Sequence, residues 1–143
     1  MSSRTVVLSD GAWAALVRAA AEAAPFEMVG LLAGAGDALV VDRFVPVVGA
    51  TCSEHRFTMP AAVFAAAEAA LRARGERWLG FAHSHPRGST ALSAADRACL
   101  WRDCMQLVVV PSQGDGATEI RAWWLTEDRI DTLAIVRAEA VSP

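Results

Sequence analysis

The sequence predicts an α+β fold in which helices pack on a curved mixed β-sheet. Helix-like and strand-like segments are mixed along the chain without the strict alternation that a parallel βαβ sheet requires. The chain of 143 residues is long enough for one hydrophobic core and too short for two domains of ordinary size. It contains no internal repeat and no low-complexity linker. We therefore expect a single domain over residues 1–143.

The N-terminal part predicts a strand followed by a helix. Segment 5–8 is a short run of valine and leucine, and Ser9 and Asp10 then offer N-cap oxygens to a helix. Bulky residues recur at helical spacing, the helix is expected to reach about Ala24, and Pro25 ends it.

Two apolar segments, 28–33 and 39–48, predict a β-hairpin. Both are rich in valine and leucine, and Gly-Ala-Gly-Asp separates them. A further short strand is expected at 56–59. Pro60 is then well placed as the first residue of a helix that reaches Arg74, because its missing N–H would be unpaired there anyway.

The second half of the chain predicts three more strands and two helices. Segment 77–84 is an apolar strand, and a loop and then a helix over 93–103 follow it. Segments 106–110 and 120–125 predict two further strands joined by a turn-rich segment. We expect the C-terminal segment 128–140 to be helical.

Composition and charge argue against several kinds of partner. The net charge is −3, and all 13 basic residues are arginines spread along the chain without a cluster, so we expect no nucleic-acid partner. Charged residues interrupt the most apolar stretches, so no segment is expected to span a bilayer. The first residues lack the apolar core of a signal peptide. We expect a cytoplasmic protein with no membrane partner, and the sequence leaves a homodimer open.

The cysteines predict neither a disulfide framework nor a zinc knuckle. Cys52, Cys99 and Cys104 are odd in number and form no Cys-x-x-Cys pair. We expect them to be buried small side chains.

Two histidines stand in the run His83-Ser84-His85-Pro86 at the end of an apolar strand. Side chains two apart on a strand project from the same face, so both imidazoles can reach one ion without a bend in the backbone. Pro86 then breaks the hydrogen-bond ladder and leaves the pair at the exposed end of the strand. The spacing therefore makes His83 and His85 candidate metal ligands.

The run Ser93-Ala94-Ala95-Asp96 begins a helix seven residues after His85. An oxygen from Asp96 would complete the set of two nitrogens and one oxygen that is typical of catalytic zinc, with water in the fourth position. The same run also predicts a helix cap, in which Ser93 accepts from the N–H three residues on and Asp96 reaches back. The two interpretations are compatible, since Ser93 can cap the helix while its hydroxyl faces the metal.

Glu27 is the candidate proton carrier. A zinc hydrolase needs a carboxylate that does not bind the metal but lies within hydrogen-bond reach of the water. Glu27 stands at the start of a strand that is otherwise wholly apolar, where burial of a carboxylate is costly without a purpose. The alternative is that Glu27 points into solvent.

Taken together, these residues resemble the motif of the JAMM metalloproteases, the catalytic (MPN-plus) branch of the MPN domains. The resemblance combines Glu27 within Pro-x-Glu-x-x-Gly-Leu-Leu, His83-x-His85-Pro86, and Ser93-x-x-Asp96. The stretch 55–60, followed by an alanine-rich helix, is similar to that of small bacterial members. In all, the resemblance covers roughly residues 5 to 125.

The resemblance implies an MPN-like fold and one Zn²⁺ per chain held by His83, His85 and Asp96. Glu27 would be the general base and then the acid, and Ser93 would donate to the oxyanion. Substrates of this family include ubiquitin conjugates and, for small bacterial members, ubiquitin-like sulfur-carrier proteins that end in Gly-Gly and bear an amino acid or peptide at the C-terminus. We therefore expect hydrolysis of a peptide or isopeptide bond after Gly-Gly, with the tail lying as an added strand on a sheet edge beside the histidine strand.

Two alternatives of other classes stay open. One is a metal-binding interaction module without turnover, and the other is a peptidase acting on cell-wall or phage-related peptides. Retention of Glu27 beside a full ligand set argues against the first, since binding alone needs no proton carrier. A zinc deaminase is excluded because Pro-Cys-x-x-Cys is absent.

Overall fold

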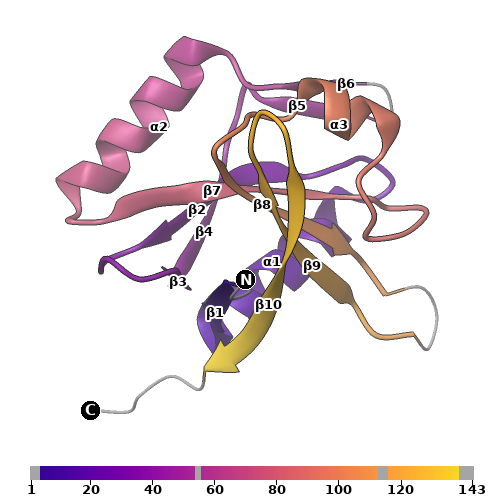
Figure 1. Cartoon of the computed structure of the whole chain (residues 1–143), viewed down its shortest axis with the longest axis horizontal. Helices are drawn as coiled ribbons and strands as arrows, with labels where there is room; N and C mark the ends of the chain where they lie inside the picture. Colours follow the sequence, from indigo (N-terminus) through magenta and orange to yellow (C-terminus); the bar gives the residue numbers. More distant parts are fainter. Residues whose placement is uncertain (1–3, 54–55, 113–115, 139–143) are drawn as a thin grey trace.

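The computed structural model describes residues 4–53, 56–112 and 116–138, which fold into a mixed sheet with helices on both of its faces (Figure 1). The helices of this part are α1 (Asp10–Ala23), α2 (Ala61–Ala73) and α3 (Ala94–Cys99). The strands are β1 (Thr5–Ser9), β2 (Val29–Gly34), β3 (Val40–Val41), β4 (Arg43–Pro46), β5 (Thr51–Ser53), β6 (Arg56–Thr58), β7 (Arg77–Ser84), β8 (Cys104–Val110), β9 (Glu119–Leu125) and β10 (Ile130–Ala138).

Within the described residues, eight strands form one sheet in the order β3-β1-β10-β9-β8-β7-β2-β4, and β5 pairs with β6 in a separate small sheet. The large sheet mixes parallel pairs, such as β7 with β8, and antiparallel pairs, such as β7 with β2. The α+β class predicted from the sequence is therefore confirmed.

Two hydrophobic clusters lie on opposite faces of this sheet. Leu31 and Leu32 are neighbours in β2 and point to opposite faces, as alternation along a strand requires. Leu32 packs in the cluster that contains Leu16 of α1, whereas Leu31 packs with Phe81 and with Leu71 of α2. The sheet is thus buried between α1 on one face and α2 with α3 on the other (Figure 1).

Most of the predicted elements are confirmed. The Ser9 side chain caps α1 by accepting a hydrogen bond from the backbone N–H of Ala12 at 3.1 Å, and the helix ends at Ala23, before Pro25. Pro60 is the N-cap of α2 rather than its first residue, because its ψ of 139° is extended.

The prediction of a helix over 128–140 is wrong, since residues 130–138 form β10; positions 139–140 lie outside the described residues. The segment contains β-branched residues that suit a strand, such as Ile130, Thr132 and Ile135. The neighbouring strands determine this conformation, because β10 pairs with β9 on one side and with β1 on the other. Tertiary pairing therefore overrides a weak helical pattern.

Three smaller features of the fold also differ from the sequence prediction. Segment 39–48 is divided, because β3 pairs with β1 whereas β4 pairs with β2. The strand β5 was not expected. The helix expected over 93–103 ends at Cys99, because Leu100 turns into an extended conformation and is buried in the hydrophobic cluster beneath α3.

The expected sheet edge beside the histidine strand is also absent. Strand β7 is hydrogen-bonded to β2 on one side and to β8 on the other, so its backbone has no free edge at the end that carries His83.

In the described part of the chain, no helix is long and apolar enough to cross a membrane.

A β-bulge in β7 determines which face the histidines occupy. Leu32 pairs with Gly80 and Ala33 pairs with Trp78, so Leu79 is the extra residue. As a result Leu79 joins the cluster around α1, while Phe81 joins the cluster on the opposite face. The side chains of β7 alternate between the two faces again after the bulge. The bulge therefore places Phe81, and with it His83 two residues later, on the face covered by α3.

We predict that Gly30→Ala destabilises the protein by about 2 kcal/mol or more, because it forces β4 away from β2. A Cβ at Gly30 would lie 2.3 Å from the Val45 carbonyl oxygen and 2.6 Å from a ring carbon of Phe44. Chemical denaturation monitored by circular dichroism would measure the change.

Gly36→Ala is the matched control. No atom lies within 4 Å of a Cβ built there, so this variant should change stability by less than about 1 kcal/mol. Equal denaturation midpoints for the two variants would contradict the close packing of β4 on Gly30.

Candidate metal centre

The two histidines lie at the end of β7, on the face that α3 covers. His83 is fully buried, and the His85 side chain is 11% exposed. The backbone N–H of His85 donates to the carbonyl of Val109 at 2.9 Å, which extends the β7–β8 pairing to the ligand itself. The two Nε2 atoms are 3.1 Å apart, so both rings point at one place.

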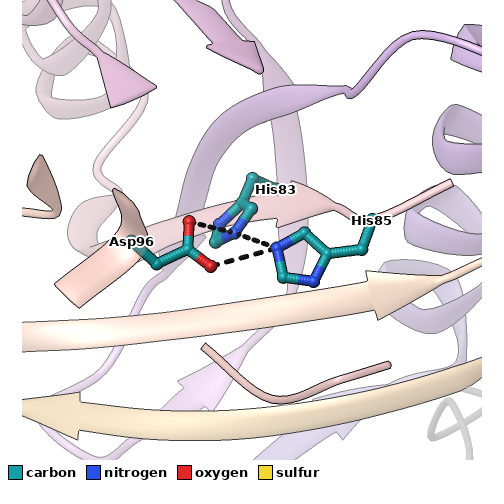
Figure 2. Close-up of side chains that lie close together, drawn as sticks. All are labelled: His83, His85 and Asp96. Carbon is teal, nitrogen blue, oxygen red and sulfur yellow. Dashed lines mark hydrogen bonds and ion pairs between the residues drawn. The ribbon is translucent and has the colours of Figure 1, made fainter. Parts of the chain in front are cut away.

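Asp96 completes the cluster from the first turn of α3 (Figure 2). Its Oδ1 lies 3.2 Å from His83 Nε2, and its Oδ2 lies 3.0 Å from His85 Nε2. The capping box is present as well: Ser93 Oγ accepts from the Asp96 N–H at 3.0 Å, and the Ser93 N–H donates to Asp96 Oδ2 at 2.9 Å. The cap and the ligand arrangement therefore occur together, and the cap orients the carboxylate toward the imidazoles.

The geometry of these three side chains fits a small tetrahedral ion. The two Nε2 atoms are 3.1 Å apart, and each lies 3.0 to 3.2 Å from one of the two oxygens of Asp96. Two ligands bound at the usual zinc distances would be about 3.3 Å apart in a tetrahedral site. The set of two nitrogens and one carboxylate oxygen also suits zinc. His83, His85 and Asp96 could thus hold a metal ion.

The loop after β7 fixes the orientation of the His85 ring. His85 Nδ1 lies 2.8 Å from the carbonyl oxygen of Ser89, so Nδ1 is the donor there and Nε2 is the nitrogen that can bind a metal. The indole Nε1 of Trp123 donates to the carbonyl of Thr90 at 3.1 Å and holds the next residue of the loop. No sequence pattern indicated these contacts, because backbone carbonyls are the acceptors.

The electrostatics of the cluster lower the pKa of Asp96 and raise the pKa of His85. Burial lowers the pKa of His85, but the hydrogen bonds to Asp96 and Ser89 and the charges of Asp96 and Glu27 raise it above the ordinary value of 6.5. Burial raises the pKa of Asp96, but hydrogen bonds from His83 and His85 hold it well below the ordinary value of 3.8. A metal ion would therefore have to displace a proton.

Ser84, which the sequence analysis left unassigned, connects the two strands of the site. Its Oγ accepts from the Met28 N–H at 2.8 Å, and its own N–H donates to the Met28 carbonyl at 3.1 Å. Its position between two candidate ligands was the available signal. These bonds fix Glu27, the residue before Met28, beside the end of β7.

Glu27 lies at this cluster without being part of it. Its charge contributes to the raised pKa of His85. Its Oε2 is buried and has no hydrogen-bond partner among the residues that the structure describes. The side chain is therefore neither simply directed into solvent nor held by a structural ion pair.

Residues 9–126 match the family described as prokaryotic homologs of the JAB domain. The chain belongs to this family. The match covers every residue of the candidate site. No curated protein matches the sequence significantly.

Solved structures share the JAB-domain fold over nearly the whole chain. A protein from Desulfitobacterium hafniense has a TM-score of 0.83 at 24% identity, over 96% of this chain and 95% of its own. A JAB1/MPN domain protein from Archaeoglobus fulgidus has a TM-score of 0.55 at 20% identity, over 92% and 99%. A structure described as a JAMM metalloprotease-like zinc site in the proteasome and signalosome has a TM-score of 0.51 at 18% identity, over 92% and 98%. The MPN-like sheet predicted from the sequence is therefore confirmed.

We predict that zinc raises the melting temperature and that the increase is larger at pH 8 than at pH 6. The stability that protonated His85 gives the metal-free protein is complete below pH 6.5 and is lost as the pH rises through its raised pKa. The contribution of Asp96 is present above pH 3.8 and does not change over this range. Apparent zinc affinity should thus increase on the order of tenfold or more from pH 6 to pH 8. Calorimetry with and without zinc would measure both quantities.

His83→Ala and Asp96→Ala serve as controls, because each removes one of three ligands. Both variants should lose the zinc-dependent increase at either pH. An increase as large as that of the unmodified protein would show that zinc binds elsewhere.

Proposed function

We propose that the protein is a zinc-dependent hydrolase of a peptide or isopeptide bond. One observation carries this proposal. The ligand atoms of His83, His85 and Asp96 lie within 4.8 Å of one another, and the charge of Glu27, which is not among them, acts on His85 from a side chain with a buried oxygen that no described residue pairs. Membership of the JAB-domain family supports the same chemistry.

The metal ligands, Glu27 and Ser93 each have a separate role in the proposed reaction. Zinc bound here would lower the pKa of a water molecule to about 7 and polarise the scissile carbonyl. Glu27 accepts a proton from the attacking water and passes it to the leaving nitrogen, so that the C–N bond breaks and one water is consumed. Ser93 Oγ already accepts from the Asp96 N–H, which leaves its own proton free to donate to the oxyanion.

We propose that the substrate is a ubiquitin-like or sulfur-carrier protein cleaved after its C-terminal Gly-Gly. Because β7 is closed on both sides, the tail must approach from another element. The small sheet of β5 and β6 lies beside α3, with β6 in contact with that helix (Figure 1). A glycine tail added to its free edge would reach Asp96 without side chains that block the approach.

A cytoplasmic location belongs to the same proposal. Cys99 and Cys104 are both free thiols, as expected of a protein kept in a reducing compartment.

The non-catalytic interaction module is the less economical explanation. A module that only binds metal has no use for a second carboxylate whose buried oxygen lacks a partner. A peptidase for cell-wall or phage-related peptides would use the same chemistry and differs only in its substrate.

We predict that the zinc-loaded protein cleaves a carrier protein extended beyond Gly-Gly and that Glu27→Gln lowers kcat by on the order of 10²-fold or more. The amide of glutamine cannot accept and return a proton. Mass spectrometry of the products would locate the cleaved bond, and elemental analysis should find full zinc in Glu27→Gln.

A carrier with leucine in place of its last glycine is the matched substrate control. We expect kcat/KM to fall at least about tenfold, since a side chain there would hinder approach to the metal. Near-normal turnover by Glu27→Gln would remove Glu27 from the mechanism. Equal cleavage of both carriers would favour the peptidase alternative.

We predict that Ser93→Ala lowers kcat by about 10²-fold while zinc stays bound, because the oxyanion loses a donor. Alanine also removes the helix cap at a cost of about 1 kcal/mol.

Ser93→Gly separates the two roles of the hydroxyl. Glycine at an N-cap costs only a few tenths of a kcal/mol, in rough terms, so this variant should melt almost normally. If Ser93 donates to the oxyanion, Ser93→Gly should lose as much activity as Ser93→Ala. Recovery of activity in Ser93→Gly would reduce the role of Ser93 to capping.

A further inference from the structure

Trp123 of β9 makes a hydrogen bond to the loop that follows the histidine strand. Its indole Nε1 donates to the carbonyl oxygen of Thr90 at 3.1 Å, across 33 positions of the sequence. Thr90 directly follows Ser89, whose carbonyl oxygen lies 2.8 Å from Nδ1 of the candidate ligand His85. Two hydrogen bonds, joined by the backbone of adjacent loop residues, therefore connect Trp123 to the ring of His85.

The strand that carries Trp123 is paired on both sides. Trp123 lies opposite Gln106 of β8 on one side and opposite Thr132 of β10 on the other. Its side chain packs against the hydrophobic cluster beneath α3, which also contains Leu92 at the end of the loop. The indole N–H is therefore a donor that the sheet presents to the loop from a fixed position.

The side chain of Ser89 gives its own carbonyl no support from the protein core. Residues 87–89 are exposed, and the Ser89 hydroxyl accepts from the Ala91 N–H at 3.2 Å, which is a contact within the loop. Thr90, in contrast, is buried, and backbone carbonyls of buried residues need a donor. The Trp123 N–H supplies that donor. The position of the Ser89 carbonyl thus depends on the anchored residue that follows it.

The hydrogen bond at Nδ1 determines what His85 can offer a metal ion. A histidine that donates from Nδ1 to a carbonyl keeps its ring in one orientation, with Nε2 as the nitrogen that can bind the metal. His85 Nε2 lies 3.1 Å from His83 Nε2 and 3.0 Å from Asp96 Oδ2, so rotation of the ring would take this nitrogen out of the cluster. Removal of such orienting partners typically weakens metal binding by about 10- to 100-fold.

We propose that Trp123 is a positioning residue for the metal centre and that its N–H orients His85 through the backbone of the loop. The inference rests on the metal-binding part of the proposed function. It adds a residue from β9, which carries none of the candidate ligands. The role of Trp123 is to support zinc affinity and the orientation of one ligand, and it takes no part in proton transfer.

The test compares Trp123→Phe with Trp124→Phe. Phenylalanine keeps an aromatic ring but has no N–H to donate. Trp124 is the matched control, because it is also half-buried but packs on the opposite face of the sheet, in the cluster that contains Leu16. Zinc affinity, measured by competition with a chelator, should fall about tenfold in Trp123→Phe and change by less than about twofold in Trp124→Phe.

The NMR signal of the His85 Nδ1 proton distinguishes positioning from a general loss of packing. In the unmodified protein, with or without zinc, this proton should exchange slowly with water because the Ser89 carbonyl accepts it. The slow exchange should be lost in Trp123→Phe and kept in Trp124→Phe. Trp123→His, whose ring nitrogen can donate, should recover part of both the zinc affinity and the slow exchange.

The possible results separate this inference from the proposed function. Equal zinc affinity and equal proton exchange in the two phenylalanine variants would overturn the positioning role of Trp123, whereas zinc binding by the unmodified protein would still support the metal centre. If the unmodified protein binds no zinc but proton exchange differs between the variants, the metal centre fails and the effect of Trp123 on the His85 ring stands.

Discussion

The two hydrogen bonds between Ser84 and Met28 are the constraint on which the candidate site depends. They close the antiparallel pairing of β2 with β7 at the point where both strands leave the sheet. The same residue that separates the two histidines therefore sets the position of the backbone that carries Glu27. Ser84 is fully buried and points to the face opposite His83, so it performs this role without occupying space at the metal.

The position of Asp96 depends on packing rather than on the stability of its own helix. Six residues are too few for α3 to be stable alone. The chain after α3 is anchored by Trp101, whose ring lies 5.0 Å from that of Phe64 and 5.1 Å from that of Phe81. Phe81 belongs to β7, two residues before His83. One aromatic cluster thus connects the strand with the histidines to the helix with the carboxylate.

The sequence predicted the site better than the fold around it, and the reason is physical. His83 and His85 are two apart on a strand, and Ser93 and Asp96 form a local cap, so short-range geometry decides where these side chains point. The conformation of 130–138 depends instead on pairing with β1, which is more than a hundred positions away in the sequence, and no local pattern encodes that contact. The same holds for the two-sided pairing of β7, which removes the sheet edge expected there.

Glu27 connects the stability of the protein to its chemistry. A buried carboxylate oxygen without a partner costs about 1 to 3 kcal/mol or more, and no residue in the described part of the chain donates a hydrogen bond to Glu27 Oε2. The charge of Glu27 contributes to the raised pKa of His85, so the positive charge of a protonated imidazole would offset part of this cost, and metal binding would remove that charge together with its proton. A bound cation would replace that charge at the same place. The unpaired oxygen would then face a water molecule beside the cation, where accepting a proton relieves the cost that burial imposes.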